Sequence, residues 1–238
     1  MSKPLRICLV GATGLVGTAL IAACVGRRDV KLTAVTRREA VLPKGARMEV
    51  LLAETSGWAD AIAAAGPDVL VSALGTTWRK AGKDEAAFRA VDHDLVLACA
   101  KAAREAGARR MIAISSVGAE RNSKSLYLRV KAETEAALEK QGFTRLDILR
   151  PGLLLGHRQE SRPLERLAQL LSPLIDLIMQ GQYSNYRSIH ADVLAQAILA
   201  LAKQKAQGRF IHEHDGLLRA IRRQELEAGV RRAVHQGS

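Results

Sequence analysis

The chain has 238 residues, of which 48% are hydrophobic, 25% charged and 3% aromatic, and it carries a formal net charge of +12. This composition excludes a disordered or fibrous protein and supplies enough apolar mass for one α/β core. The positive charge favours anionic partners, such as a phosphate-bearing cofactor, an acidic substrate or nucleic acid. Because the basic residues are spread along the chain without interleaved aromatic residues, no nucleic acid partner is expected.

Short apolar runs and helical patterns alternate along the first part of the chain. Residues 5–10 form an apolar run that ends at Gly11, which predicts a strand entering a tight turn, and a helix should follow to about Gly26. Further strands are predicted at 31–36, 47–51 and 69–72, and a helix at 58–65. The uncharged stretch 7–26 has a second interpretation, as a signal peptide with a lipid-modified cysteine. Three regularly spaced glycines favour the strand, turn and helix.

The alternation continues through the middle of the chain. A helix is predicted at 85–105, followed by a strand at 111–114, and a helix at 126–140, followed by a strand at 146–149. One face of the first of these helices is expected to consist of Val91, Leu95, Ala98 and Ala102. Six strands alternating with helices predict an α/β fold with a doubly wound parallel sheet and helices on both faces. Past Gly152 the pattern is less regular, with helices predicted at 164–179, 192–203 and 217–233.

The turn after the first strand has the spacing GxxGxxG rather than the better-known GxGxxG. Glycine is needed where the backbone bends sharply, where it approaches a pyrophosphate and where the helix packs on the strand. A small-residue turn for helix packing is the alternative, but the position between a strand and a helix favours a cofactor loop. We therefore assign cofactor binding to Gly11, Thr13, Gly14, Leu15, Val16 and Gly17.

The end of the second predicted strand indicates which dinucleotide binds. An NAD site carries an acidic residue there for the ribose hydroxyls, whereas this chain has Arg37 and Arg38. Two guanidiniums would bind a 2′-phosphate through charge-assisted hydrogen bonds, so NADP(H) is the predicted cofactor. The alternative is a pair of solvated surface arginines with Glu39 as a partner.

The fourth predicted strand ends in a run that could pass close to a bound cofactor. Its cofactor-binding residues are predicted to be Ala73, Leu74, Gly75 and Thr76. Trp78 and Arg79 follow, and we interpret them as part of an ordinary surface loop without a catalytic role.

A candidate proton-transfer set lies further along the chain. Tyr127 and Lys131 are one helical turn apart on the same helix face, and Ser115 and Ser116 end the preceding strand. A free phenol, with a pKa of about 10, is a poor proton carrier at neutral pH unless a nearby cation favours its ionised form. We therefore predict that Lys131 assists Tyr127 and that a serine, preferably Ser116, hydrogen-bonds the substrate oxygen. The alternative is an exposed aromatic residue beside a surface lysine.

Taken together, these motifs resemble the atypical short-chain dehydrogenase/reductases. The runs 126–131, 150–155 and 158–162 are similar to the Tat-interacting-protein oxidoreductase branch, and the resemblance covers about residues 5–215. It implies a Rossmann fold, Tyr127 as proton donor or acceptor and Lys131 as its cofactor-anchoring neighbour. It also implies that the backbone of Pro151, Gly152 and Leu153 contacts the nicotinamide carboxamide. The eukaryotic relatives are described as NADPH-binding proteins with regulatory roles.

We therefore expect a cytoplasmic, NADP(H)-dependent oxidoreductase that acts on a small-molecule carbonyl or alcohol. The alternative is a non-catalytic NADP(H) sensor or regulatory scaffold on the same fold. Residues 1–238 are treated as a single NAD(P)-binding domain, in which about 152–238 form a small substrate-side lobe. A protein partner or homo-oligomer stays open.

Other functional classes are disfavoured. Cys8, Cys24 and Cys99 lie in apolar runs and indicate buried thiols in a reducing compartment. No metal is expected at His212 and His214, a lone pair of histidines where an extended segment passes into a loop. No membrane partner is expected, because no segment is long and apolar enough to span a bilayer.

Overall fold

The structure is a computed structural model that describes residues 3–156 and 187–236. The helix predicted at 164–179 and the run 158–162 lie outside the described residues. Side chains are described as far as Val230.

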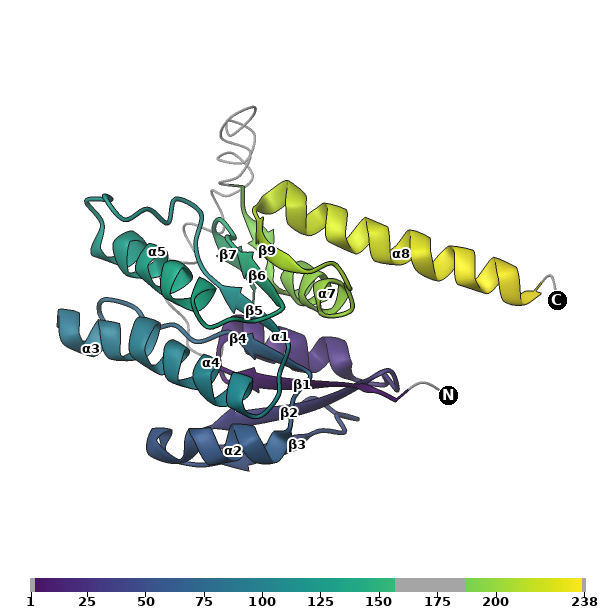
Figure 1. Ribbon diagram of the computed structural model, residues 1–238, viewed down its shortest axis with the longest axis horizontal. Coiled ribbons are helices and arrows are strands. Elements are labelled where there is room, and N and C mark those ends of the chain that lie inside the picture. The colour runs from purple at the N-terminus through teal and green to yellow at the C-terminus, as the bar shows by residue number, and fades with distance from the viewer. Residues whose placement is uncertain (1–2, 157–186, 237–238) are drawn as a thin grey trace.

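A seven-stranded parallel sheet forms the centre of the molecule (Figure 1), in the order β3-β2-β1-β4-β5-β6-β9. Its strands are β1 (Leu5–Val10), β2 (Val30–Thr36), β3 (Glu49–Leu52), β4 (Val69–Ser72), β5 (Arg110–Ile114), β6 (Arg145–Leu149) and β9 (Gly208–His212). The six predicted strands are all present, and the predicted α/β class is confirmed. The seventh strand, β9, pairs in parallel with β6. It was missed because it is mostly exposed and lacks a continuous apolar run.

Helices cover both faces of the sheet (Figure 1). One face carries α1 (Leu15–Cys24), α7 (Ala191–Ala202) and α8 (His214–Gln236), and the other carries α2 (Trp58–Ala65), α3 (Glu85–Arg89), α4 (Leu95–Glu105) and α5 (Leu126–Glu139). The inner strands, β2, β1, β4, β5 and β6, are largely buried because each face of the sheet packs against a helical layer.

The helix predicted at 85–105 is divided by a π-helical turn, Ala90–Asp94 (η2), which joins α3 to α4. The predicted apolar face was wrong at Ala98, which is exposed, while Val96 and Cys99 are buried instead. The true inward face passes through Asp92, which is fully buried. A search for apolar periodicity does not count a charged residue as buried. The predicted inward face was therefore shifted by one residue along the helix.

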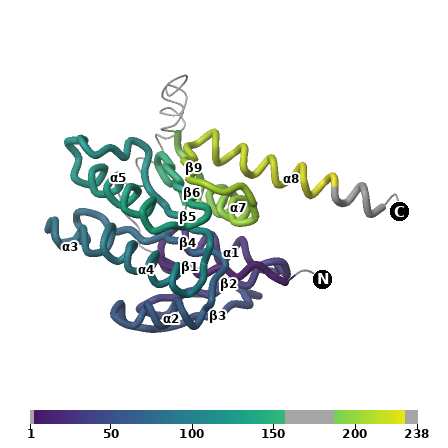
Figure 2. The backbone as a smooth tube through the Cα atoms, in the orientation of Figure 1, coloured from purple at the N-terminus to yellow at the C-terminus, as the bar shows by residue number. Residues whose placement is uncertain are grey.

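The C-terminal part of the chain contributes to both the main layers and a small extra sheet. A two-stranded parallel sheet joins β7 (Leu154–Leu155) to β8 (Ile189–His190). By contrast, α7 packs on α1 within the core, and β9 extends the main sheet. Figure 2 shows α8 leaving the body after its first turns, where Leu217 is buried, so that Leu226 and Val230 further along are exposed.

Candidate functional site

The turn between β1 and α1 has no room for side chains at two of its glycines. Gly11 has a φ of +88°, and a Cβ added there would lie 2.4 Å from the carbonyl oxygen of Ala73 at the end of β4. A Cβ on Gly17 would lie 2.2 Å from the carbonyl oxygen of Gly11. The turn is therefore pressed against the end of β4 and against the first turn of α1, as a dinucleotide-binding loop requires.

The N-terminus of α1 is suited to an anion. Gly14 is the N-cap residue, no side chain caps the helix, and no acidic residue lies in its first turn. The positive end of the helix dipole therefore meets no protein carboxylate in that turn. Thr13 and Gly14 are exposed, Leu15 is half-buried, and Val16 packs in the core.

Arg37 and Arg38 are exposed at the end of β2, the strand beside β1. Within residues 3–156 and 187–230, neither guanidinium has an ion-pair partner, and Glu39 does not pair with them. Thr36 fixes the local backbone, because its hydroxyl donates a hydrogen bond to the carbonyl oxygen of Arg38 at 2.9 Å. Two unpaired cations thus follow the strand end at which a 2′-phosphate is expected.

Helix α5 carries Tyr127, Lys131 and Glu135 at four-residue intervals, so the three share one face. Tyr127 is 39% exposed, whereas Lys131 and Glu135 are buried. The Nζ atom of Lys131 lies 5.9 Å from the centroid of the Tyr127 ring. The exposed phenol and the buried ammonium are therefore neighbours, as the sequence spacing predicts.

Asp92 is a site residue that the sequence analysis missed. Its Oδ1 atom lies 2.9 Å from the Nζ atom of Lys131, and its Oδ2 atom accepts a hydrogen bond from the backbone N–H of Thr76 at 2.7 Å. A single buried carboxylate thus connects the run after β4 to α5. The available signal was a charged residue inside an otherwise apolar helical stripe.

The predicted cofactor residues and the predicted proton-transfer residues converge at this carboxylate. A Cβ on Gly75 would lie 3.6 Å from Oδ1 of Asp92 and 3.9 Å from Nζ of Lys131. The same run after β4 contacts the glycine turn through Ala73 and Gly11. The two halves of the predicted site therefore meet at the carboxyl end of β4.

The two serines have different environments. The buried Ser115 hydroxyl donates a 2.5 Å hydrogen bond to Glu135, and the same carboxylate accepts hydrogen bonds from Nε and Nη2 of Arg150 at 2.9 and 2.5 Å. These contacts raise the pKa of Arg150. Among the described residues, the hydroxyl of the half-buried Ser116 has only a 3.2 Å contact, to the carbonyl oxygen of Val117. Ser115 is thus engaged in an internal network, and Ser116 is the more available hydroxyl.

Pro151, Gly152 and Leu153 follow β6 after a single residue, Arg150, and lie beside the segment that follows β5. The backbone N–H of Val117 donates to the carbonyl oxygen of Pro151 at 3.0 Å, which joins the segments after the two strands. Pro151 is buried, Gly152 is half-buried and Leu153 is exposed. The backbone predicted to contact the nicotinamide carboxamide therefore lies next to the segment that carries Ser116.

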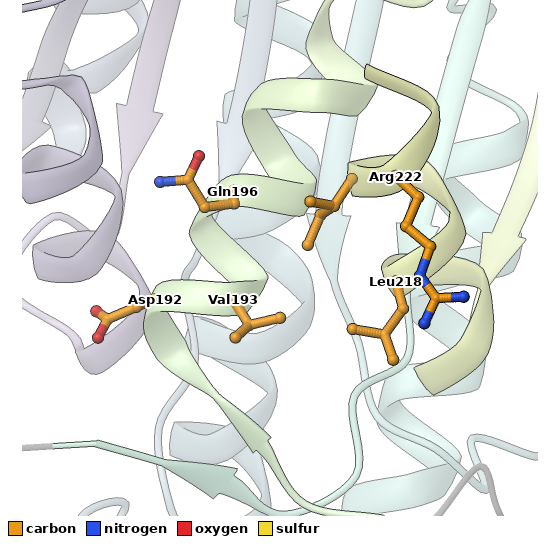
Figure 3. A pocket seen from close by; sticks show the side chains of 6 residues that line it. Asp192, Val193, Gln196, Leu218 and Arg222 are labelled. Carbon is orange, nitrogen blue, oxygen red and sulfur yellow. The ribbon is translucent and has the colours of Figure 1, made fainter. Parts of the chain in front are cut away.

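A cavity of about 380 Å³ lies elsewhere, between α7 and α8 (Figure 3). Figure 3 shows Val193 and Leu218 pointing into the space between the two helices. Its lining residues are Asp192, Val193, Gln196, Leu218, Ile221 and Arg222. None of the residues predicted to bind cofactor or move a proton lines this cavity, so it is separate from the candidate site.

Comparison with known proteins identifies the family. The sequence model of a family described as NAD(P)H-binding matches residues 11–205. The chain belongs to this NAD(P)H-binding family. Among curated proteins, it is 36% identical over 199 residues to protein fmp52, mitochondrial, of Aspergillus niger, covering 81% of the chain and 84% of the relative. It is 38% identical over 161 residues to the protein of the same name from Candida albicans, covering 66% and 70%.

Solved structures share the fold of this NAD(P)H-binding protein. UDP-N-acetylglucosamine 4-epimerase from Methanobrevibacter ruminantium, in complex with UDP-N-acetylmuramic acid, superposes with a TM-score of 0.67 at 15% identity, over 89% of this chain and 77% of that one. WbmG from Bordetella bronchiseptica, in complex with NAD and UDP, gives a TM-score of 0.66 at 18% identity, over 88% and 73%. These similarities establish a Rossmann-type fold.

The relatives correct the predicted location. The expectation of a cytoplasmic protein was wrong on this evidence, because the curated relatives are named as mitochondrial proteins. The prediction rested on buried thiols, on the rejection of a signal peptide and on the lack of a membrane-spanning segment. None of these distinguishes the cytoplasm from a reducing compartment inside an organelle. Within the part of the chain that the structure describes, no helix is long and apolar enough to cross a membrane.

Proposed function

We propose that the protein is an NADP(H)-dependent oxidoreductase of the atypical short-chain type, related to the Tat-interacting-protein branch, which interconverts a carbonyl and an alcohol. The observation that carries this proposal is the convergence of Gly75, Asp92 and Lys131. It joins the run beside the glycine turn to the helix that bears Tyr127. Neither motif alone would support this chemistry.

The residues of the chain divide the work as follows. The β1–α1 turn holds the pyrophosphate, and Lys131 and the Pro151–Leu153 backbone orient the nicotinamide end. When bound, the reduced cofactor supplies a hydride to the carbonyl carbon. The Tyr127 hydroxyl donates its proton to the carbonyl oxygen, and the nearby Lys131 ammonium stabilises the negative charge left on the phenol. Ser116 hydrogen-bonds the same oxygen and positions it. The alcohol forms once the hydride and proton have been transferred, and the reverse reaction returns both.

Cofactor preference is the first test. Arg37 and Arg38 support NADPH over NADH, because each can make a charge-assisted hydrogen bond to a 2′-phosphate. Fluorescence titration should show NADPH binding at least about tenfold more tightly, which corresponds to about 1.4 kcal/mol. The Arg37→Ala, Arg38→Ala double variant should lose this preference. The matched control is Arg222→Ala, Arg223→Ala on α8, which removes the same charge and should retain it. Equal affinities in the wild type would refute the arginine assignment.

Turnover is the second test. In a screen of carbonyl compounds with NADPH, Tyr127→Phe should lower kcat by about 10² or more, because general acid catalysis is lost. Its affinity for NADPH should stay unchanged, since the ring is retained. Activity that is insensitive to this substitution would exclude the proposed role of the phenol.

A second candidate function is a non-catalytic NADP(H) sensor or scaffold, and one observation favours it. Asp92 neutralises the ammonium of Lys131 at 2.9 Å, which weakens the electrostatic support that Lys131 gives to an ionised phenol. A sensor would bind NADPH with the Arg37 and Arg38 dependence described above and reduce no carbonyl in the screen.

A further inference from the structure

Aromatic side chains are scarce in this protein, yet three of them stand in a row at the candidate site. The whole chain contains 2 Trp, 3 Tyr and 3 Phe. The ring of Trp78 meets that of Phe88 edge-to-face at 6.4 Å between centroids, and Phe88 meets Tyr127 in the same way at 6.1 Å. Trp78 thus lies two ring contacts away from the proposed proton donor.

The exposure of these rings is uneven. Phe88 is 1% exposed, whereas Trp78 is 44% exposed and Tyr127 39%. The buried ring of Phe88 therefore packs between two partly exposed aromatic rings, those of Trp78 and Tyr127. Exposing a large apolar ring to water is unfavourable. An exposed apolar surface next to the Tyr127 hydroxyl combines the two kinds of group that line ligand sites, apolar rings and a polar group.

Two of the cations near these rings are already paired with carboxylates. Lys131, on the helix of Tyr127, is paired with Asp92. Arg89, the residue after Phe88, is paired with Glu85 and Glu133 at 3.1 and 2.7 Å. At these two cations an anionic substrate group would have to compete with the carboxylates, whereas an apolar ring would not.

We propose that Trp78 is a substrate-binding residue that stacks on the ring of a planar, apolar aromatic carbonyl compound. Tyr127 would then donate its proton to the carbonyl oxygen of the same compound. This inference rests on the proposed function and names its substrate class. It revises the interpretation of Trp78 as part of an ordinary surface loop. It also separates this protein from WbmG, whose structure contains UDP in addition to NAD.

The test compares two ketones with eight carbon atoms each, acetophenone and 2-octanone, together with UDP-glucose. Binding is measured by calorimetry on the full chain saturated with NADP⁺, which cannot reduce a ketone. Acetophenone should bind more tightly than 2-octanone, and Trp78→Ala should weaken its binding about tenfold, the order of one aromatic contact plus its buried area. Trp78→Phe should retain most of the affinity.

The second tryptophan provides the matched control. Trp58, the first residue of α2, is 4% exposed and donates a hydrogen bond to the carbonyl oxygen of Ala53, which follows β3. Trp58→Phe should leave acetophenone binding unchanged. The proposal is overturned if Trp78→Ala binds acetophenone as well as the wild type does, or if UDP-glucose is the ligand whose affinity depends on Trp78.

The same titrations distinguish this inference from the proposed function. NADPH binding that survives in Trp78→Ala, with unchanged acetophenone affinity, refutes the stacking role alone. If the wild type binds no NADPH, the proposed function fails. Acetophenone is then titrated into the cofactor-free protein, where a loss in Trp78→Ala supports the stacking role and no loss refutes it.

Discussion

The carboxylate of Asp92 lies 2.9 Å from the ammonium of Lys131, and both side chains are almost fully buried, with 0% and 7% exposed. Taking two charges out of water is costly, and their attraction offsets that cost only while both are present. The same carboxylate accepts the N–H of Thr76, so the pair also fixes the backbone beside Gly75. One contact thus stabilises both α5 and the backbone beside Gly75 in the candidate site.

Breaking this pair on one side should destabilise the protein. We expect Asp92→Asn to lower the free energy of unfolding by about 3 kcal/mol, because the buried Lys131 charge loses its partner while the acceptor for Thr76 is kept. Lys131→Met should cost a similar amount. The double variant should cost clearly less than the two single effects added together. Urea denaturation of all four proteins measures this coupling, and additive losses would show that the two groups do not interact.

The glycine turn should not tolerate even a methyl group at Gly17. A Cβ there would meet the backbone of Gly11 and Ala12, which cannot rotate away as a side chain can. Gly17→Ala should therefore cost about 2 kcal/mol or more in unfolding free energy and abolish NADPH binding. Gly229→Ala is the control and should be neutral or slightly stabilising, because an added Cβ in this helix would meet no described atom within 4 Å beyond its own stretch of helix backbone. Normal nucleotide binding by Gly17→Ala would contradict the tight turn.

Asp29 links the start of β2 to the end of α7, and acid should weaken this link. Hydrogen bonds from Arg27 and Lys203 hold the pKa of Asp29 below its ordinary value. A depressed folded-state pKa contributes stability above the ordinary value of about 4, and this stability is lost as the pH falls from about 5 towards the folded-state value. The side chain is half exposed, so the contribution is about 1 kcal/mol or less. Thermal unfolding of wild type and Asp29→Asn at pH 6 and pH 3 should show the smaller acid loss in the variant. An equal loss would exclude the contribution.

Two thiols should be inert in the folded protein. Burial raises the pKa of Cys8 and of Cys99 to about 12, so almost no thiolate is present at neutral pH. Iodoacetamide at pH 8 should leave both unmodified, as read by mass spectrometry. In guanidinium chloride both should react within minutes. Modification of Cys8 in the native state would show that the core opens around β1.

Local sequence signals predicted the strands well because each buried strand is a continuous apolar run between turn residues. The glycine turn was predictable because Gly11 and Gly17 occupy positions where a side chain cannot fit. Strand β9 was missed since it lies at the edge of the sheet, where Ile211 is exposed and no apolar run is required. Its pairing with β6 depends on tertiary structure.

The charged part of the site was harder to predict. Asp92 and Glu135 are buried carboxylates, and periodicity treats charged residues as solvent-facing. Their burial is made possible by partners distant in the sequence, Lys131 for the first and Arg150 for the second. The separate environments of Ser115 and Ser116 follow from the same network, which sequence spacing alone does not contain.

The position of β9 has a consequence for synthesis on the ribosome. Until residues 208–212 have emerged from the ribosome, β6 is an edge strand whose backbone groups on one side are unpaired. The segment that continues from β6 through Arg150, Pro151 and Gly152 therefore lacks its final support until His212 has been translated. Nascent chains that stall earlier would expose this edge strand, through which two chains could pair. A chaperone that covers extended backbone would act at this stage.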